Sequence, residues 1–214
     1  MGKTIAVLNQ KGGVGKTTST INIAAALANM GKSVLVIDLD PQANATSGIG
    51  IDKNHINLSI YNLLTSSDSA DSAILDTRID GLRILPATTA LAAAEPELAG
   101  ELQRELVLQK AISDLVYDYI IIDCPPSLGL LSINALTAAD SVLIPVQTEF
   151  YALEGLGLLM QTIQRVQGGL NTDLKLLGVI MTMVDSRNSL SSQVVEEVKK
   201  HFGDYVFKTQ IPRN

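Results

Sequence analysis

The sequence predicts an α/β domain with a mostly parallel sheet and helices on both of its faces. Short apolar runs rich in Val and Ile alternate with stretches of helical pattern along the 214 residues. Trp is absent, and aromatic residues make up only 4% of the chain. The core must therefore be built from Ala, Val, Ile and Leu, as buried parallel strands usually are. A single domain, 1–214, is the natural count at this length.

The apolar runs and the helical stretches follow one another in order. The predicted strands are 4–9, 33–38, 82–86, 119–123, 141–145 and 176–184. The predicted helices are 18–30, 96–116, 130–138, 152–168 and 190–202. Continuous apolar strands that alternate with helices indicate a parallel sheet covered on both faces. The polar segment 48–80 is less regular, and we expect its stretch 66–71 to form a surface loop or a helix cap.

Composition excludes several classes of protein. The net charge of −6 argues against a protein that coats nucleic acid by bulk charge, although a local basic patch is compatible with it. Cys124 is the only cysteine, which excludes an internal disulfide framework and fits a reduced, cytoplasmic setting. The chain begins a strand almost at once and has no long uncharged apolar run, so we expect neither a signal peptide nor stable membrane insertion.

The first turn of the predicted sheet carries the most informative motif. Residues 11–18 read Lys-Gly-Gly-Val-Gly-Lys-Thr-Thr, directly after the first strand and at the start of the first helix. Backbone N–H groups of such a turn converge on an anion, and the helix N-terminus adds positive potential. Lys16 can reach the β- and γ-phosphates, and the Thr17 hydroxyl can ligate Mg²⁺. The other residues expected to bind the nucleotide through this loop are Lys11, Gly12, Gly13, Val14, Gly15 and Thr18.

The match to the usual phosphate-loop pattern is imperfect. Gly-x-x-x-x-Gly-Lys-Thr would need glycine where this chain has Gln10, and a second lysine, Lys11, lies inside the loop. A glycine-rich connection without a ligand is the plainer interpretation, but the position between strand and helix and the ending Gly-Lys-Thr favour a P-loop NTPase. Gly-x-Gly-x-x-Gly does not occur in this turn, which argues against a dinucleotide-binding enzyme.

Acidic residues end two of the predicted strands. Asp38 and Asp40 precede Pro41, at the end of a sheet where parallel strands meet their ligand. An Asp-Pro strand terminator would explain Asp40 but leaves Asp38, a charge that closes an apolar run, without a reason. The run Tyr-Ile-Ile-Ile-Asp at 119–123 has the Walker B form, in which Asp123 holds Mg²⁺.

Phosphoryl transfer needs positioning, a metal ion and positive charge where the transition state is negative. Thr17, Asp38 and Asp123 are the predicted metal residues, and Asp40 is the candidate for orienting the attacking water. Lys16 and Lys11 would supply charge, the latter to its own nucleotide or across a dimer interface; spacing alone leaves a solvated loop lysine equally open. The predicted cofactors are ATP and Mg²⁺.

These motifs resemble one family. The segment 11–18, Asp-Leu-Asp-Pro-Gln-Ala-Asn-Ala-Thr at 38–46 and Ile-Ile-Ile-Asp-Cys-Pro-Pro-Ser at 120–127 are similar to the ParA/Soj partitioning ATPases of chromosomes and plasmids. These belong to the deviant-Walker group, which also contains MinD and the nitrogenase iron protein. The resemblance runs from residue 2 to residue 214 and includes the segments 134–140, 151–155 and 211–214.

The resemblance implies a working cycle. ATP would drive a sandwich homodimer in which Lys11 reaches the partner's phosphates, Lys16, Thr17 and Asp123 hold the nucleotide and Mg²⁺, and Asp40 sets up hydrolysis, with weak turnover by the protein alone. The dimer would bind double-stranded DNA without sequence preference, in a nucleoid-associated, cytoplasmic location. A ParB/Spo0J-type activator protein would stimulate hydrolysis and release the DNA.

The resemblance also places residues outside the phosphate loop. Arg187 falls where a DNA-contacting arginine is implied, and Lys199, Lys200 and His201 could add charge, although a lysine pair on a helix is usually a solvated face. Pro212 and Asn214 would begin the pocket for the base. Because family members usually continue past this point, we expect that 1–214 lacks a C-terminal segment.

Other members of the group provide alternatives. A MinD-like, membrane-cycling ATPase that places the division site would carry a basic amphipathic C-terminal helix, which this sequence does not show. A redox protein like the nitrogenase iron protein would need two cysteine ligands per subunit, and only Cys124 exists. A GTP switch would place Asn-Lys-x-Asp where residues 181–185 read Met-Thr-Met-Val-Asp, so we expect ATP.

Overall fold

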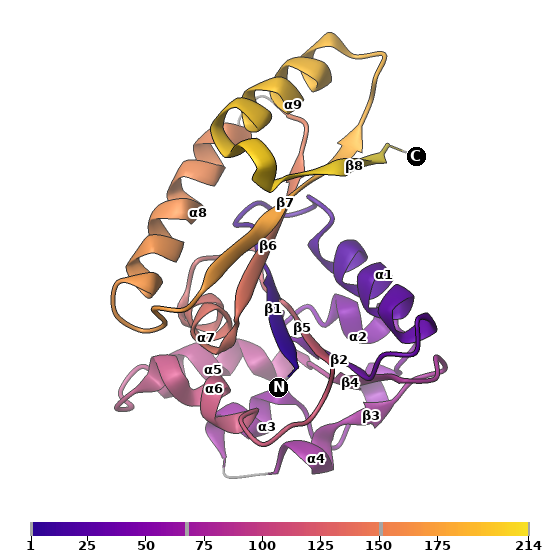
Figure 1. Cartoon of the computed structure of the whole chain (residues 1–214). Coiled ribbons are helices and arrows are strands. Elements are labelled where there is room, and N and C mark those ends of the chain that lie inside the picture. Colours follow the sequence, from indigo (N-terminus) through magenta and orange to yellow (C-terminus); the bar gives the residue numbers. More distant parts are fainter. Residues whose placement is uncertain (1, 67–68, 150–151, 214) are drawn as a thin grey trace.

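The computed structural model of the chain describes residues 2–66, 69–149 and 152–213. Its centre is an eight-stranded sheet with the order β3-β4-β2-β5-β1-β6-β7-β8 (Figure 1). The strands are β1 (Lys3–Val7), β2 (Val34–Asp38), β3 (Leu75–Asp76), β4 (Leu82–Leu85), β5 (Tyr119–Asp123), β6 (Ser141–Gln147), β7 (Lys175–Val184) and β8 (Val206–Pro212). The helices are α1 (Lys16–Asn29), α2 (Asn44–Gly48), α3 (Ile60–Thr65), α4 (Ala70–Ala73), α5 (Ala94–Leu98), α6 (Val107–Ala111), α7 (Leu130–Ala138), α8 (Ala152–Gln167) and α9 (Ser189–Phe202).

Strand pairing confirms the predicted fold class. The neighbours in the sheet run parallel, except that β3 is antiparallel to β4. All six predicted strands are present, as β1, β2, β4, β5, β6 and β7. The central strand β1 lies between β5 and β6, and its residue Val7 is level with Asp123. This register brings the ends of β1 and β5 to one edge of the sheet.

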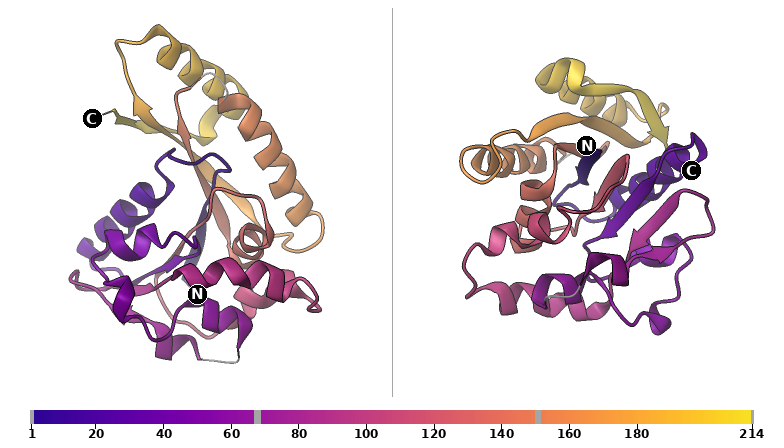
Figure 2. Two further views of the ribbon diagram at one scale, coloured as in Figure 1. Left: turned by 180° about the vertical axis from the view of Figure 1, so that it is seen from behind. Right: turned by 60° about the horizontal axis from the view of Figure 1, so that its bottom comes forward.

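Alternating side chains of the sheet build two cores. Ile5 and Val7 of β1 pack with α1 and α2 on one face, and Ala6 and Leu8 pack on the other face with the helices from α3 to α9. Successive strand residues point to opposite faces, so a strand that is apolar throughout must be covered on both sides. Figures 1 and 2 show this arrangement, with α1 on one side of the sheet and α7 and α8 on the other.

The predicted helix 96–116 is wrong. The chain forms α5, a 3₁₀ turn at Arg104–Leu106, and then α6. Gln103 has a φ of 57°, a left-handed conformation that a regular helix does not contain. Asn134 of α7 holds the broken segment, because its side chain accepts from Leu108 N at 3.0 Å and donates to Arg104 O at 2.8 Å. A tertiary contact therefore overrides the helical pattern.

The polar segment 48–80 is more ordered than its composition suggests. It contains α3, α4 and the short strand β3, and Ser59 and Asn62 form a reciprocal capping box at the start of α3. The predicted loop or cap at 66–71 is only partly described, because residues 67–68 lie outside the described residues. Ser69 precedes α4 as its N-cap residue.

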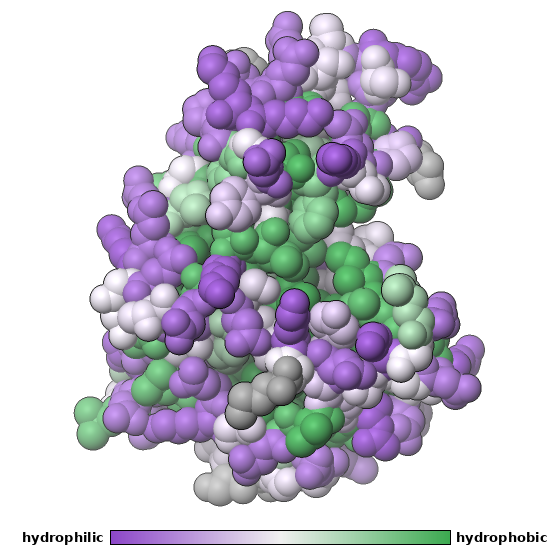
Figure 3. Space-filling view, in the orientation of Figure 1, coloured by the Kyte–Doolittle hydropathy of each residue, from purple (hydrophilic) through white to green (hydrophobic). Residues whose placement is uncertain are grey.

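One face of the outer strands keeps apolar surface. Leu177 of β7 and Phe207 and Ile211 of β8 are exposed, and Figure 3 shows hydrophobic surface across the middle of the face drawn in Figure 1. β8, which is not among the six strands predicted from the sequence, extends the sheet beyond β7. Among the helices described, none combines the length and the apolar character needed to cross a membrane.

Candidate functional site

The candidate site lies where β1, β2 and β5 end. Asp38 is level with Asp123 across the pair β2–β5, and Val7 is level with the same residue across β1–β5. The loop that follows β1 leads directly into α1. Carboxyl ends of parallel strands form the ligand crevice of α/β sheets, so the strand order itself assembles the motifs that lie far apart in the sequence.

The phosphate loop depends on glycine at two positions. Gly13 has a φ of 77° and Gly15 a φ of 90°, a region that residues with a Cβ rarely adopt. Gly15 is the N-cap residue of α1, so the helix begins at Lys16 with its free N–H groups facing the loop. Val14 is buried beneath the loop, where its carbonyl accepts from the Thr182 hydroxyl at 2.8 Å.

Lys16 is a buried cation within the loop. Its Nζ donates to Lys11 O at 3.0 Å. Burial lowers the pKa of Lys16, while the nearby carboxylate of Asp123 acts in the opposite direction. A cation with so little solvent around it gains much from a bound phosphate, and its position at the first turn of α1 aims it at the same anion as the loop amides.

Thr17 and Asp123 form the pair that suits a metal ion. The Thr17 hydroxyl donates to Asp123 Oδ2 at 2.7 Å, and Thr20 donates to Oδ1 at 3.3 Å. Burial raises the pKa of Asp123 to about 7, against the lowering effect of these two hydroxyls. Hydroxyl and carboxylate oxygens are hard ligands of the kind that Mg²⁺ takes, usually with waters and substrate phosphates completing the shell.

The described residues contain no dedicated metal cage. Among 2–66, 69–149 and 152–213, no group of three or more His, Cys, Asp or Glu side chains could hold a metal ion. A metal at Thr17 and Asp123 would therefore depend on the nucleotide for further ligands, which fits Mg²⁺ bound as a nucleotide complex.

Hydrogen bonds from the protein occupy both carboxylate oxygens of Asp38. Its side chain is completely buried, and it accepts from Thr46 N and Thr46 Oγ1, both at 2.7 Å, and from Asp40 N at 3.2 Å. Burial raises the pKa of Asp38, and the Thr46 hydrogen bonds lower it. These contacts favour a role in holding the loop over the predicted direct ligation of Mg²⁺.

Asp40 and the phosphate loop share one cavity of about 440 Å³. Asp40 is mostly buried and its Oδ1 accepts from Gln42 N at 2.9 Å. The lining residues that the sequence predicts are Gly12, Gly13, Gly15, Lys16, Thr17, Thr18 and Asp40. The structure thus brings the Asp-Pro loop and the phosphate loop, which are separate in the sequence, to the same space.

Comparison with known proteins identifies the family. A family model described as an AAA domain matches residues 2–176. The sporulation initiation inhibitor protein Soj of Bacillus subtilis is 56% identical over 100% of this chain and 85% of its own length. The chromosome-partitioning ATPase Soj of Treponema pallidum is 50% identical over 100% of this chain and 84% of its own length. The chain belongs to the ParA/Soj family of partitioning ATPases.

A solved structure gives the same fold. Cobyrinic acid a,c-diamide synthase from Mycobacterium smegmatis, with bound ADP and magnesium, has a TM-score of 0.94 and 42% sequence identity. The likeness covers 100% of this chain and 88% of that chain. The fold-class prediction of a P-loop domain with a mostly parallel sheet is thereby confirmed.

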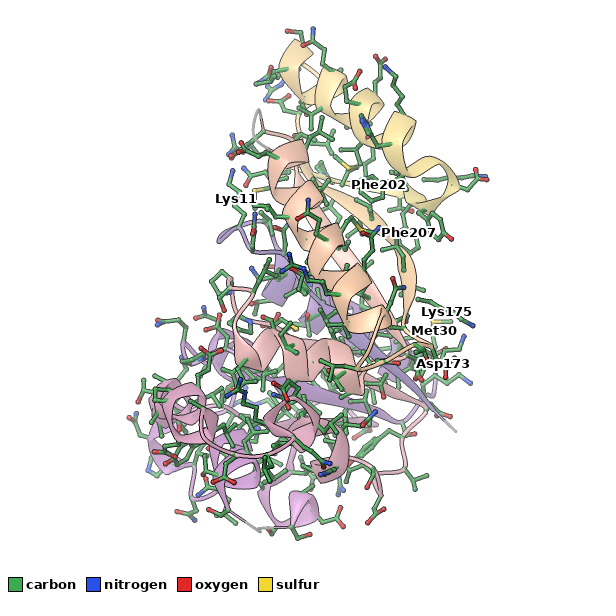
Figure 4. The ribbon with its side chains drawn as sticks, turned by 90° about the vertical axis from the view of Figure 1, so that its left-hand side faces the viewer. Lys11, Met30, Asp173, Lys175, Phe202 and Phe207 are labelled. Atoms are coloured by element: carbon green, nitrogen blue, oxygen red, sulfur yellow. The ribbon has the colours of Figure 1, made fainter. Side chains whose placement is uncertain are left out.

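Lys11, the second lysine of the ParA/Soj loop, turns away from the nucleotide cavity. Its ammonium pairs with Glu149, and its side chain remains 43% exposed. It lines a different hollow, with Pro126, Glu154 and Leu158. Figure 4 shows Lys11 at the outer edge of the molecule beside α8. From this position Lys11 is available to another molecule.

Four further residues that line the cavity are not among the predicted site residues. Gln42, Asn44, Pro126 and Met183 also line it. Met183 is in the left-handed region with a φ of 51°, and the pairing of β7 with β8 shifts register there. Strained backbone of this kind is concentrated at functional sites. Gln42, Asn44 and Pro126 lie inside the quoted motifs 38–46 and 120–127, whereas Met183 lies in none of the quoted family segments, which is why motif reasoning missed it.

The predicted base-pocket residues are only partly placed. Pro212 is the last residue of β8 and lies level with Val184 at the end of β7. Asn214 lies outside the described residues.

Cys124 is a buried free thiol directly after the Walker B strand, and burial raises the pKa of this thiol.

Arg187 follows β7 in an exposed loop. Its guanidinium donates to both oxygens of Asp185, at 3.0 and 3.2 Å, and its side chain is 89% exposed. The hydrogen bonds from Arg187 lower the pKa of Asp185, and the charge of Arg213 adds to this effect. Lys199 and Lys200 lie in the last turn of α9, whereas Arg187 precedes its first turn, so about 16 Å of helix separates them.

Proposed function

We propose that this ParA/Soj chain binds and hydrolyses ATP with Mg²⁺, and that ATP drives a homodimer which binds double-stranded DNA without sequence preference. A ParB/Spo0J-type activator then stimulates hydrolysis and releases the DNA, which gives the protein a nucleoid-associated location. The observation that carries the proposal is the different placement of two lysines of the loop: Lys16 lies at the nucleotide cavity, and Lys11 faces outward.

The residues around the cavity suit phosphoryl transfer. The amides of the loop and the ammonium of Lys16 bind and orient the phosphates. Thr17 and Asp123 would hold Mg²⁺, which supplies positive charge to the transferring group. Asp40 faces the same cavity and would orient the water, with weak turnover by the protein alone.

Lys11 explains why hydrolysis would need a dimer. Reaching a partner's phosphates requires that Lys11 leave its own Glu149, an exposed pair of the kind that contributes little to stability. Positive charge brought to the transition state by a second molecule resembles an arginine finger. Each subunit would then complete the other's site.

DNA binding by a chain of net charge −6 must be local. Arg187 and Arg213 both lie near Asp185, and dimerisation would double this patch. Phosphate contacts of this kind are lost steeply as salt rises.

Sedimentation of the Asp40→Ala variant with ATP, Mg²⁺ and a nonspecific DNA duplex tests the cycle. We expect a stable dimer that co-sediments with DNA, because the variant binds ATP without turning it over. Lys16→Ala is the matched control and should remain a monomer. A dimer that ignores DNA but sediments with anionic vesicles would instead support a MinD-like, membrane-cycling ATPase, and a monomer in every condition would contradict the proposal.

The structural likeness favours a second candidate. The cobyrinic acid a,c-diamide synthase of Mycobacterium smegmatis shares the fold at a TM-score of 0.94, and amide synthesis also consumes ATP when a carboxylate is activated. This candidate predicts that ATP turnover rises with cobyrinic acid and an ammonia donor, and is unchanged by DNA with the activator. The partitioning cycle predicts the reverse.

A further inference from the structure

Thr46 is a fully buried hydrogen-bond centre outside the nucleotide cavity. Its hydroxyl donates to Asp38 Oδ2 at 2.7 Å and accepts from Ala87 N at 3.0 Å. Its own N–H donates to the same Asp38 oxygen at 2.7 Å. Thr46 lies in α2, just beyond the Asp-Pro loop. One side chain therefore joins the end of β2, the helix α2 and the segment that follows β4.

The carboxylate of Asp38 carries this contact to Asp40. Its second oxygen, Oδ1, accepts from Asp40 N at 3.2 Å. Asp40 is mostly buried, accepts from Gln42 N at 2.9 Å, and faces the cavity shared with Lys16. Two successive hydrogen bonds thus lead from the Thr46 hydroxyl to the backbone of Asp40.

The far side of Thr46 is anchored to the core. Ala87 is fully buried in the larger of the two cores, and the preceding residue, Pro86, accepts from Ile60 N at 2.9 Å. The N–H of Ala87, which donates to the Thr46 hydroxyl, therefore belongs to a fixed part of the fold. The Asp-Pro loop is linked to this fixed part through Thr46 and Asp38, which limits its movement.

The bonding of Thr46 differs from that of an ordinary buried helical threonine. Thr137 of α7 is equally buried and donates to Ile133 O at 2.8 Å, the usual contact of a hydroxyl with the preceding turn. The Thr46 hydroxyl instead donates its hydrogen bond to the carboxylate of Asp38, which lies outside its helix. A charge-assisted bond of this kind is stronger than a neutral one, and it is directed at the loop.

We infer that Thr46 is a positioning residue for hydrolysis, which sets the orientation of Asp40 through the carboxylate of Asp38. The inference rests on the role proposed above for Asp40. Thr46 is not among the residues that line the nucleotide cavity. Its hydroxyl fixes the loop, so that Asp40 is held in place before ATP binds.

The test compares steady-state hydrolysis and equilibrium ATP binding, both with Mg²⁺, in the full chain. Thr46→Val removes the hydroxyl at nearly constant volume, and Thr46→Ser restores it. Loss of such a supporting contact typically lowers activity about 10- to 100-fold, so we expect kcat to fall by that factor in Thr46→Val, with ATP affinity within about twofold of the parent. Thr46→Ser should recover most of kcat.

Thr137→Val is the matched control, because it removes an equally buried hydroxyl in α7, and we expect it to keep the parental kcat. If Thr46→Val fails to fold by circular dichroism, Thr46→Ala, which leaves room for a water at Ala87 N, replaces it with the same expectation. Parental kcat in Thr46→Val or Thr46→Ala, an equal loss of ATP affinity, or no recovery in Thr46→Ser would overturn the inference. Asp40→Ala in the same assay separates the two ideas: if it turns over normally, the proposed role of Asp40 fails first.

Discussion

At the scale of single residues, two effects oppose each other at Asp123: burial favours its protonated form, whereas holding Mg²⁺ requires the carboxylate. Its carboxyl has the ordinary pKa of 3.8 in an unfolded chain and a pKa of about 7 in the fold, because burial raises it. Between these values the folded protein keeps a proton that the unfolded chain releases. The contribution of Asp123 to the free energy of unfolding without metal must therefore fall as pH rises through this window.

This pH dependence is a testable prediction. Raising the pH from 4 to 8 should lower the contribution of Asp123 to the free energy of unfolding by at most about 4 kcal/mol. Urea unfolding at a series of pH values, without metal or nucleotide, measures the slope. Asp123→Asn should flatten it, whereas Asp118→Asn, at an exposed carboxyl whose pKa hydrogen bonds from Ser33 lower, should not. An identical slope in Asp123→Asn and the parent would contradict the buried, raised pKa.

The site residues that the sequence predicts are those whose signal lies in their immediate sequence neighbours. Lys16 and Thr17 follow the glycines of the loop, and Asp123 follows an apolar strand. Met183 carries no such signal, because its place at the cavity goes with a register shift between β7 and β8. Thr46 ends the segment 38–46 that resembles the family, but only its hydrogen bond to Asp38, 8 positions away, points to the positioning role inferred for it. The sequence predicts Asp38 as a metal residue because it is a charge at a strand end, and only the structure reveals its hydrogen bonds to Thr46 and Asp40.

At the scale of elements, the start of α1 is the part of the fold on which binding most depends. Gly15 has a φ of 90°, and the space around its absent Cβ is ordinary, with Thr182 Cγ2 at 3.6 Å. A side chain there would meet no clash, so the loss would come from backbone conformation alone. Gly31, just after the same helix, has a φ of 79° with nothing within 4 Å of the missing Cβ.

These two glycines make a matched pair. Gly15→Ala and Gly31→Ala should each lower the free energy of unfolding by about 1–2 kcal/mol, the cost of a left-handed residue with a Cβ. Only Gly15→Ala should also weaken ATP binding, by about tenfold or more, which corresponds to ~1.4 kcal/mol or more, because it shifts the amides of the phosphate loop. Thermal or urea unfolding and equilibrium binding of ATP measure the two effects. Equal ATP affinity in the two variants would argue against a phosphate cradle at this loop.

The elements also show where the periodicity of apolar residues fails to predict secondary structure. The central strands β2 and β5 were predictable because all of their positions except the last are apolar, and these apolar residues are buried or half-buried. The segment 96–116 has the composition of a helix, yet Gln103 is left-handed and Asn134 binds the broken turn. Helical propensity is a weak prior that tertiary contacts override, and no local pattern reveals a partner 26 residues away.

At the scale of the whole molecule, the proposed binding of DNA by an acidic protein depends on where its cations lie. Arg187, in the loop before α9, and Arg213, directly after β8, both lie near Asp185, whereas Lys199 and Lys200 lie at the far end of α9. In the free protein Arg187 is held by both oxygens of Asp185. Binding a phosphate requires exchanging this pair for one with DNA, which is possible because the guanidinium is almost fully exposed.

Arg187→Ala should therefore weaken DNA binding of the ATP-bound dimer without changing ATP affinity. If each subunit contributes one phosphate contact, the slope of log affinity against log salt should become less steep by about 2 per dimer. Arg83→Ala is the matched control, because Arg83 is also an exposed arginine paired with an aspartate, at the opposite side of the sheet. Titration of a fluorescent duplex at several salt concentrations, in the Asp40→Ala background that prevents turnover, gives both slopes. Should Arg187→Ala and Arg83→Ala reduce affinity equally, the effect would be one of general charge, and the loop before α9 would lose its place as the DNA contact.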